Sequence, residues 1–209
     1  IPAALIENSA RMAGMPVGPL SLNDETGVHL GLKILRATEA DLGPAAVNAG
    51  MTKVLEDLVE KHQRFGRKNG KGFYDYPQGQ PKKLWPGLAD LLPKKLSREE
   101  VEALDVEELK QRFLVLQAVE AARTFEEKVV TDVREADVGS ILGFGFAPFT
   151  GGTLSYIDMM GTKAFVELCR KFEAKYGPRF KPGKLLVEMA ERGESFYGRF
   201  APEKKKEAA

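Results

Sequence analysis

The apolar residues of this 209-residue chain recur every three or four positions along much of its length, which is the period of a helix with one buried face. The pattern predicts helices over residues 28–41, 54–66, 101–127 and 163–176, and a last short helix over 185–189. No convincing run of strands appears, so the sequence predicts an all-α fold. The apolar stripes are Leu30, Ile34, Leu35 and Ala37; Val54, Leu55, Leu58 and Val59; Leu109, Phe113, Leu116, Val119, Ala122 and Phe125; and Phe165, Cys169, Phe172 and Tyr176.

Glycine, proline and capping residues mark where the elements begin and end. Gly43-Pro44 stops the first helix, and Ser97–Glu100 has the capping-box pattern ahead of the third. Residues 66–76 mix glycine, basic and aromatic residues, which predicts a turn followed by a short extended segment. Residues 77–93 contain four prolines and little periodicity. We interpret them as a connector over the surface, with Trp85 as its anchor.

One pattern occurs twice, in Gly14–Gly27 and in Gly145–Gly161. Each copy has an entry glycine, a proline, a further glycine, a Leu-Ser pair and then Asp-x-x-Gly. A repeat of this length predicts two copies of one structural unit. The chain is therefore divided into a first repeat over 1–76, a connector over 77–96 and a second repeat over 97–209.

Each copy of the pattern predicts a compact elbow, because proline and glycine exclude regular helix there. Asp24 and Asp158 are placed to cap free backbone N–H groups. Two interpretations of the first elbow stay open. It is a structural joint, or it lines a ligand cleft in which Met15, Pro16 and Val17 form an apolar ledge suited to an acyl or thioester group.

Composition removes several classes of function. The chain has 31 basic and 30 acidic residues, a net charge of +1, so no overall charge draws it to nucleic acid. No apolar run reaches the roughly 20 residues of a membrane span. Cys169 lies on an apolar stripe and is interpreted as a buried hydrophobe, and His29 and His62 fall in helical stretches without a catalytic motif.

Two motifs in the first repeat resemble a known family. Gly14–Pro19 with Asp24-x-x-Gly27, followed by Phe65–Tyr76, is similar to the C-terminal domain of 3-hydroxyacyl-CoA dehydrogenases. In the second repeat, Leu142–Gly152 and Tyr156–Gly161 look like the degenerate second copy found in the multifunctional α-subunit of the fatty-acid β-oxidation complex. The resemblance implies two helical domains of the 6-phosphogluconate dehydrogenase C-terminal-like fold, packed as an intramolecular pseudo-dimer.

The same resemblance implies that the chain is the C-terminal part of a longer polypeptide with enoyl-CoA hydratase and NAD-binding domains. NAD and the catalytic histidine would belong to the NAD-binding domain, since this sequence has no Gly-x-Gly-x-x-Gly after a strand. We therefore expect no catalytic, cofactor-binding or metal-binding residue here, and no dehydrogenase activity in the isolated chain. The residues expected to contact acyl-CoA are Met15, Pro16, Val17, Gly18, Pro19 and Leu22.

Partners and location also follow from the resemblance. It implies acyl-CoA as substrate of the full-length protein, a thiolase β-subunit as partner, and bacterial cytoplasm rather than mitochondrial matrix. The alternative is a non-catalytic assembly module whose stripes over 101–127 and 163–176 form one interface. The basic loop Arg67–Lys71 is interpreted as a solvated turn pinned by Phe73 and Tyr74 rather than as a site for CoA phosphates.

Overall fold

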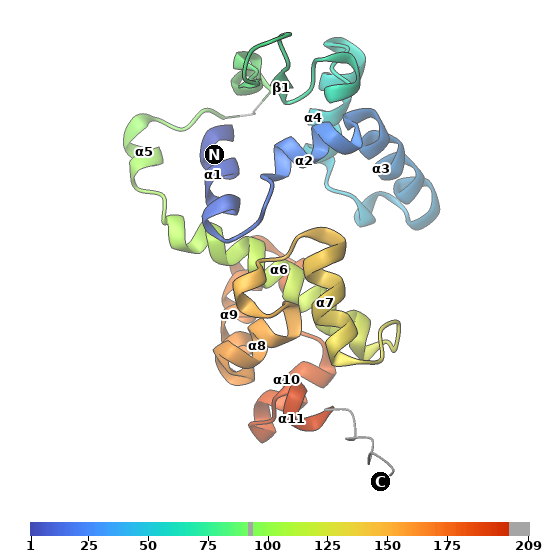
Figure 1. Ribbon diagram of the computed structural model, residues 1–209, viewed down its shortest axis with the longest axis vertical. Helices are drawn as coiled ribbons and strands as arrows, with labels where there is room; N and C mark the ends of the chain where they lie inside the picture. The colour runs from blue at the N-terminus through green and yellow to red at the C-terminus, as the bar shows by residue number, and fades with distance from the viewer. Residues whose placement is uncertain (92–93, 201–209) are drawn as a thin grey trace. The chain divides into compact units, whose positions relative to one another are not determined.

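The computed structural model describes residues 1–91 and 94–200. The parts of the expected connector and second repeat at 92–93 and 201–209 lie outside the described residues. Helices dominate the described chain, which confirms the all-α prediction (Figure 1). Among the described residues the strands are two short ones, β1 (Tyr74–Asp75) and β2 (Lys83–Leu84), which pair antiparallel with Tyr74 opposite Leu84.

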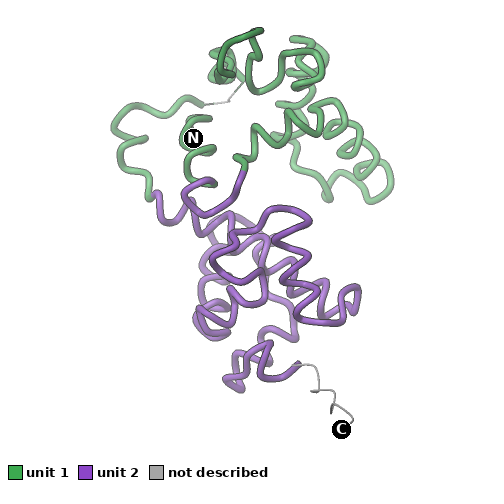
Figure 2. Tube along the Cα trace, in the orientation of Figure 1, with its two compact units in different colours: residues 1–10, 17–105 green, residues 11–16, 106–209 purple. Residues whose placement is uncertain are grey.

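The chain divides into two compact units (Figure 2). Unit 1 comprises residues 1–10 and 17–105, and unit 2 comprises 11–16 and the chain from 106 onward. Helix α1 (Ala3–Met12) passes from one unit into the other. Unit 1 also holds α2 (Pro19–Thr26), α3 (Val28–Leu42), η1 (Pro44–Ala46), α4 (Ala49–Glu56), η2 (Asp57–Lys61), η3 (Arg67–Asn69), β1, β2, η4 (Pro86–Asp90) and α5 (Arg98–Glu102).

Unit 2 is built around one long helix and its neighbours. Its elements are α6 (Val106–Glu126), α7 (Val133–Phe144), η5 (Pro148–Thr150), α8 (Thr153–Met160), α9 (Thr162–Tyr176), η6 (Pro178–Phe180), α10 (Lys184–Arg192) and α11 (Phe196–Arg199). The predicted helix over 101–127 is divided, because α5 ends at Glu102 and α6 begins at Val106. The capping box ahead of α5 is confirmed, since Ser97 and Glu100 each accept a hydrogen bond from the other's backbone N–H.

The core of unit 1 is small, and it corrects one predicted stripe. Helix α3 ends before Gly43 as expected, but Leu30 and Ile34 are exposed. The buried face of α3 instead carries Val28 and Leu32, which pack with α4, η2 and Phe73. The sequence pattern permits either rotation of this helix, and its packing partners select one of them.

Two further local predictions concern the region after α4. The second helix ends at Lys61 in a π-helical turn, earlier than the predicted end at 64–66. The loop over 66–76 does form a turn, η3, and then the short strand β1, as predicted. Trp85 is half-buried against the core of unit 1, where the Arg64 guanidinium lies 4.3 Å from its ring centroid. Its predicted role as an anchor is confirmed.

The core of unit 2 buries the stripes of α6 and α9 together. Val119, Ala122 and Phe125 of α6 lie in the same cluster as Phe165 and Phe172 of α9. Both stripes are thus used inside unit 2. They do not form the exposed interface considered in the assembly interpretation.

The repeat in the sequence is also a repeat in structure. Helices α2 and α8 have the same length, as do α3 and α9, and η1 and η6. The elements of each pair start 134 positions apart and follow matching glycines, and the two α-helical pairs also end at matching glycines such as Gly27 and Gly161. The short helix α11, which the pattern analysis missed, follows the second copy as β1 follows the first.

Candidate functional site

The first elbow is held by a buried carboxylate on α1. Glu7 Oε1 accepts hydrogen bonds from the backbone N–H groups of Leu20 (2.6 Å) and Ser21 (3.3 Å) at the start of α2. Its other oxygen, Oε2, accepts from the Tyr74 hydroxyl at 2.7 Å. These donors are among the unpaired N–H groups that every helix start presents. Glu7 therefore joins α1, α2 and β1 at one point, and we call this arrangement the unit 1 clamp.

A second buried carboxylate closes the other end of α2. Asp24 accepts from the backbone N–H groups of Phe73 (2.7 Å) and Tyr74 (2.8 Å) and from the Tyr76 hydroxyl (3.0 Å). Burial raises the pKa of Asp24 above its ordinary value, and the two backbone hydrogen bonds oppose that shift. The prediction that Asp24 caps free N–H groups is confirmed, although the groups belong to a segment about 50 positions away rather than to a nearby helix start.

Unit 2 repeats this arrangement with different side chains. Asp137 on α7 accepts from the backbone N–H groups of Leu154 (2.7 Å) and Ser155, and from the Tyr197 hydroxyl (2.9 Å). It also accepts from the Ser155 hydroxyl at 2.5 Å. Asp158 accepts from the backbone N–H groups at the start of α11. We call the group around Asp137 the unit 2 clamp. Its backbone donors, Leu154 and Ser155, occupy the same positions of the repeat as Leu20 and Ser21 in the unit 1 clamp.

The clamps explain why both elbows carry a glycine directly before the short helix. A Cβ on Gly18 would overlap the Glu7 carboxylate. A Cβ on Gly152 would lie 2.5 Å from the Asp137 Cα, and Gly152 has a φ of +123°, which side chains rarely adopt. These two glycines of the repeated motif are thus accounted for by close approach of a buried acid.

The residues expected to contact acyl-CoA fall on both sides of the division between units. Met15 and Pro16 belong to unit 2, while Val17, Gly18, Pro19 and Leu22 belong to unit 1. Within unit 1, Val17 is 39% exposed and Leu22 is 42% exposed, so both present apolar surface. The backbone N–H groups of Leu20 and Ser21 are used by Glu7 and are not free to bind a ligand.

A separate apolar groove lies beside the elbow of unit 1. It has a volume of about 520 Å³, and we call it the unit 1 groove. Leu20 lines it, a residue that the sequence analysis did not select, although its place between Pro19 and Ser21 marks an apolar side chain at the start of a helix. None of the six expected contact residues lines this groove. Its lining includes Ile6, Leu20, Val54, Phe73, Leu84 and Leu88.

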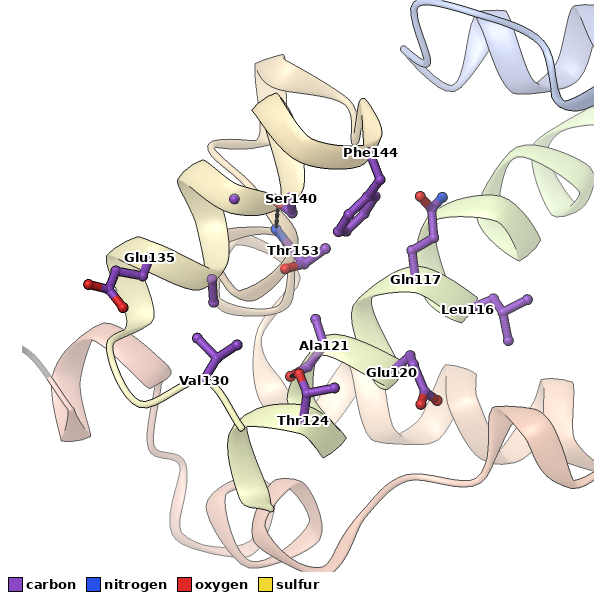
Figure 3. Close-up of a pocket in the computed structure, with 12 residues that line it drawn as sticks. Leu116, Gln117, Glu120, Ala121, Thr124, Val130, Glu135, Ser140, Phe144 and Thr153 are labelled. Carbon is purple, nitrogen blue, oxygen red and sulfur yellow. Dashed lines mark hydrogen bonds between the residues drawn. The ribbon is translucent and has the colours of Figure 1, made fainter. Parts of the chain in front are cut away.

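Unit 2 has a second cavity, of about 420 Å³, between α6, α7 and the start of α8 (Figure 3). Figure 3 shows Phe144 on one side of it, facing Gln117 on the other. Leu116, Ala121 and Val130 are among its apolar lining residues, and Glu120 and Glu135 are acidic ones. The Thr153 hydroxyl at this cavity is buried and has no hydrogen-bond partner among the described residues.

The remaining candidate residues have structural surroundings. Cys169 is buried in the unit 2 core, and burial raises the pKa of its thiol to about 12. His29 and His62 make edge-to-face contacts with Phe65 and Trp85. Over residues 1–91 and 94–200, no group of three or more metal-ligating side chains is found. In the same part of the chain, no helix is long and apolar enough to cross a membrane.

The basic loop after η2 is tied to unit 1 at both ends. Arg67 pairs with Glu25 at 2.8 Å, while Lys68 and Lys71 are exposed. Phe73 at the end of the loop is buried in the core of unit 1. The predicted pinning of the turn is confirmed, and the cations remain on the solvent side.

Comparison with solved structures shows which known proteins share this fold. Two solved structures share the fold: 3-hydroxybutyryl-CoA dehydrogenase from Escherichia coli K12 substr. MG1655 (TM-score 0.62, 17% identity, 90% of this chain and 54% of that one) and the dehydrogenase part of multifunctional enzyme 1 from C. elegans (TM-score 0.57, 13% identity, 90% and 42%). The fold is therefore that of the helical part of these dehydrogenases.

Sequence similarity indicates a family. Residues 2–76 match the family described as 3-hydroxyacyl-CoA dehydrogenase, C-terminal domain. The chain is 40% identical over 191 residues to the fatty acid oxidation complex subunit alpha of Shewanella loihica (strain ATCC BAA-1088 / PV-4). The match covers 88% of this chain and 25% of that relative. The chain therefore spans about a quarter of the relative's length. The resemblance predicted from the two motifs is confirmed.

Proposed function

We propose that this chain is the C-terminal part of a longer 3-hydroxyacyl-CoA dehydrogenase of the fatty-acid β-oxidation complex. The match of residues 2–76 to the C-terminal domain of such enzymes supports this, together with the similarity to a complex subunit of which this chain covers 25%. The full-length protein would oxidise 3-hydroxyacyl-CoA with NAD. An enoyl-CoA hydratase domain and an NAD-binding domain would lie in the rest of the polypeptide.

The described residues do not fit an NAD site. The dinucleotide-binding fold needs a parallel sheet with a glycine-rich turn at its edge, and the strands described here are one antiparallel pair of two residues each. Hydride transfer is therefore assigned to the domain outside this chain. The part left to this chain is to bind and enclose the acyl-CoA and to exclude water from it.

The observation that carries this role is exposed apolar surface on the first elbow, at the ledge residue Val17 and at Leu22, which we add to the ledge here. Val17 and Leu22 are exposed, while the backbone between them is fixed by the unit 1 clamp. A ledge on a rigid backbone offers apolar contact without an added entropy cost of ordering it. We propose that Met15, Pro16, Val17, Gly18, Pro19 and Leu22 form the acyl-CoA side of the cleft in the full-length enzyme.

Steady-state kinetics of the full-length enzyme test this role. Val17→Asn and Leu22→Asn should each raise KM for a 3-hydroxyacyl-CoA about tenfold, since each replaces apolar contact with a polar group worth about 1–2 kcal/mol, and kcat should change little. Leu30→Asn is the matched control, because Leu30 is an equally exposed leucine on α3 of the same unit, 46% exposed. Unchanged KM in both elbow variants would refute the ledge as a contact surface.

The isolated 209-residue chain provides a second test of the assignment. It should reduce no NAD in the presence of 3-hydroxyacyl-CoA. Steady NAD reduction by the isolated chain would contradict the assignment of hydride transfer to another domain. We also propose that the full-length protein binds a thiolase β-subunit and lies in the bacterial cytoplasm. Co-purification of the two from the cytoplasmic fraction tests both proposals.

A second function, as an assembly module, is favoured by the structural repeat itself. We propose that the two units pair inside one chain as a pseudo-dimer, which is how a tandem duplication can replace association of two copies. Light scattering on the chain should then give the mass of a monomer at micromolar concentration. An obligate dimer would contradict internal pairing.

A further inference from the structure

The cavity of unit 2, which we call the unit 2 cavity, takes no part in the function proposed above. It has a volume of about 420 Å³ and lies between α6, α7 and the start of α8 (Figure 3). Pockets of this size hold small organic ligands in other proteins. All of its lining residues belong to unit 2. The cavity is therefore formed within one compact unit of this chain.

The walls of the unit 2 cavity are largely apolar. Their apolar residues are Leu116, Ala121, Val130, Ala136, Gly139 and Phe144. Two polar side chains of α6 also line the cavity, but each donates to a backbone carbonyl of its own helix. The Gln117 amide donates to Phe113 at 2.7 Å, and the Thr124 hydroxyl donates to Ala121 at 2.9 Å. The walls therefore suit an aliphatic chain better than a polar ligand.

One polar group in the lining of the unit 2 cavity is not used by the fold. Thr153, the first residue of α8, is fully buried, and its hydroxyl has no hydrogen-bond partner in the part of the chain that the structure describes. Ser140 beside it already accepts from the Thr153 N–H and donates to the Asp137 carbonyl (Figure 3). Burying an unpaired hydroxyl destabilises a protein. The repeated fold does not require it, since the matching position in unit 1 is Pro19.

The charged residues of the lining select against an anionic ligand. Glu120 and Glu135 are exposed residues of the lining, and Arg123 pairs with Glu120. Among the described residues that line the cavity, none is lysine, arginine or histidine. A carboxylate or phosphate head group would therefore meet like charge at Glu135 without a lining cation to pair with it.

We propose that the unit 2 cavity binds an uncharged aliphatic ligand whose one hydrogen-bonding group pairs with the Thr153 hydroxyl. The chain of the ligand lies against the apolar walls. The hydroxyl is closed off from water, so the ligand reaches it when the ring of Phe144, which is 50% exposed at the last position of α7, turns aside. This inference goes beyond the proposed function, because it requires neither acyl-CoA nor a domain outside this chain.

A titration of the 209-residue chain with 1-octanol, followed by the NMR signals of methyl groups, tests the proposal. The methyl signals of Leu116, Ala121 and Val130 should shift and saturate. Octanoate has the same chain length but carries a carboxylate, so at neutral pH it should bind at least about tenfold more weakly. Methyl signals that do not respond to 1-octanol would overturn the proposal. Equal affinity for octanoate would overturn the assignment to an uncharged ligand.

Two buried threonines, each the first residue of a helix in unit 2, test the role of the hydroxyl. Thr153→Val keeps the side-chain shape and should raise the Kd for 1-octanol about fivefold, the effect of losing one hydrogen bond. It should also raise Tm, because the unpaired hydroxyl is gone. Thr162→Val is the matched control, since the Thr162 hydroxyl donates to the Glu194 carbonyl at 2.9 Å. It should lower Tm and leave the Kd unchanged. A lower Tm or an unchanged Kd in Thr153→Val would overturn the role of Thr153.

Two glycines of α7 show whether the ligand occupies this cavity. Gly139 lines it and Gly143 does not, and a Cβ at either glycine meets no atom within 4 Å. Gly139→Leu should fill the cavity and raise the Kd for 1-octanol at least about tenfold, because the added side chain takes the ligand's place. Gly143→Leu should leave the Kd within about twofold of the parent value, since this side chain adds to α7 outside the cavity. Equal Kd values in the two variants would place the ligand elsewhere and overturn the proposal.

Discussion

The two clamps fix the start of a short helix with different acidic side chains. Glu7 and Asp137 each take the first free N–H groups of a short helix and a tyrosine hydroxyl. The shorter Asp137 brings α7 close enough to α8 for the Ser155 hydroxyl to join it, whereas Ser21 accepts instead from Lys82. Tyr156 after the unit 2 clamp is buried, and the corresponding Leu22 is exposed. Unit 2 thus buries this position of its elbow in its core, whereas unit 1 leaves the corresponding side chain exposed.

Two natural probes separate the units in any test of this comparison. The only tryptophan, Trp85, lies in unit 1, and the only cysteine, Cys169, lies buried in unit 2. Tryptophan fluorescence in urea therefore reports unit 1. Thiol labelling, which at pH 8 requires exposure of a group whose pKa is about 12 when folded, reports unit 2.

The largest effect should come from removing the clamp carboxylates. Asp137→Ala should lower the free energy of unfolding of unit 2 by about 3–4 kcal/mol, because several buried donors lose a charged acceptor. Glu7→Ala should cost unit 1 about 2–3 kcal/mol, since fewer donors depend on it. Urea titrations with the two probes measure both. Glu135→Ala and Asn8→Ala, exposed neighbours on the same helices, are the controls and should change stability little.

The clamp glycines should give the next largest effects. Gly152→Ala should cost about 3 kcal/mol, because its Cβ meets the Asp137 main chain and its φ is positive. Gly18→Ala should cost about 1–2 kcal/mol, since the Glu7 side chain can rotate away. Gly139→Ala on α7 has open space around it and should stabilise by about 0.5–1 kcal/mol. Equal losses at positions 18 and 152 would show that both clamps are equally rigid.

Removing the tyrosine hydroxyls should produce smaller and nearly equal losses. Tyr74→Phe and Tyr197→Phe each delete one hydrogen bond to a clamp carboxylate. The expected loss is about 1 kcal/mol in the corresponding unit, because the rings remain and the carboxylates keep their backbone donors. Thermal unfolding of the two variants beside the parent chain measures this. A loss confined to one variant would break the proposed equivalence of the clamps.

The pH dependence of unit 1 should give the smallest effect. The pKa of Asp24 is raised in the folded state, so its contribution to stability is fully present below the ordinary value of 3.8 and is lost as pH rises through the folded pKa. Asn at position 24 does not titrate, so the parent chain should lose stability relative to Asp24→Asn as pH rises through that window. Above the folded-state pKa, the difference in free energy of unfolding between the two proteins should stay constant. Urea titrations followed by Trp85 at several pH values test the sign. A gain in stability with rising pH in this comparison would show that the hydrogen bonds to Asp24 outweigh its burial.

Local patterns predicted much of the fold. The elbows, the capping box at Ser97, the loop before β1 and the stripe of α9 all follow from residues within a few positions of one another. The candidate site was predicted less completely. The ledge expected at Met15, Pro16 and Val17 stays a prediction, and the groove lined by Leu20 was not expected. Its walls come from α1, α2, α4 and η4, and no short window of sequence contains them.

The sequence by itself determined the helical class, the positions of the glycine elbows and the duplication, because periodicity and turn chemistry are short-range properties of the chain. Only the tertiary structure decided which face of α3 is buried, that Glu7 and Asp137 close the elbows, and that Tyr74 and Tyr197 complete them. Those choices depend on partners roughly 60 positions apart. A buried carboxylate can accept donors from any segment that packing brings within reach, so its role is set by the packed chain rather than by its neighbours in sequence.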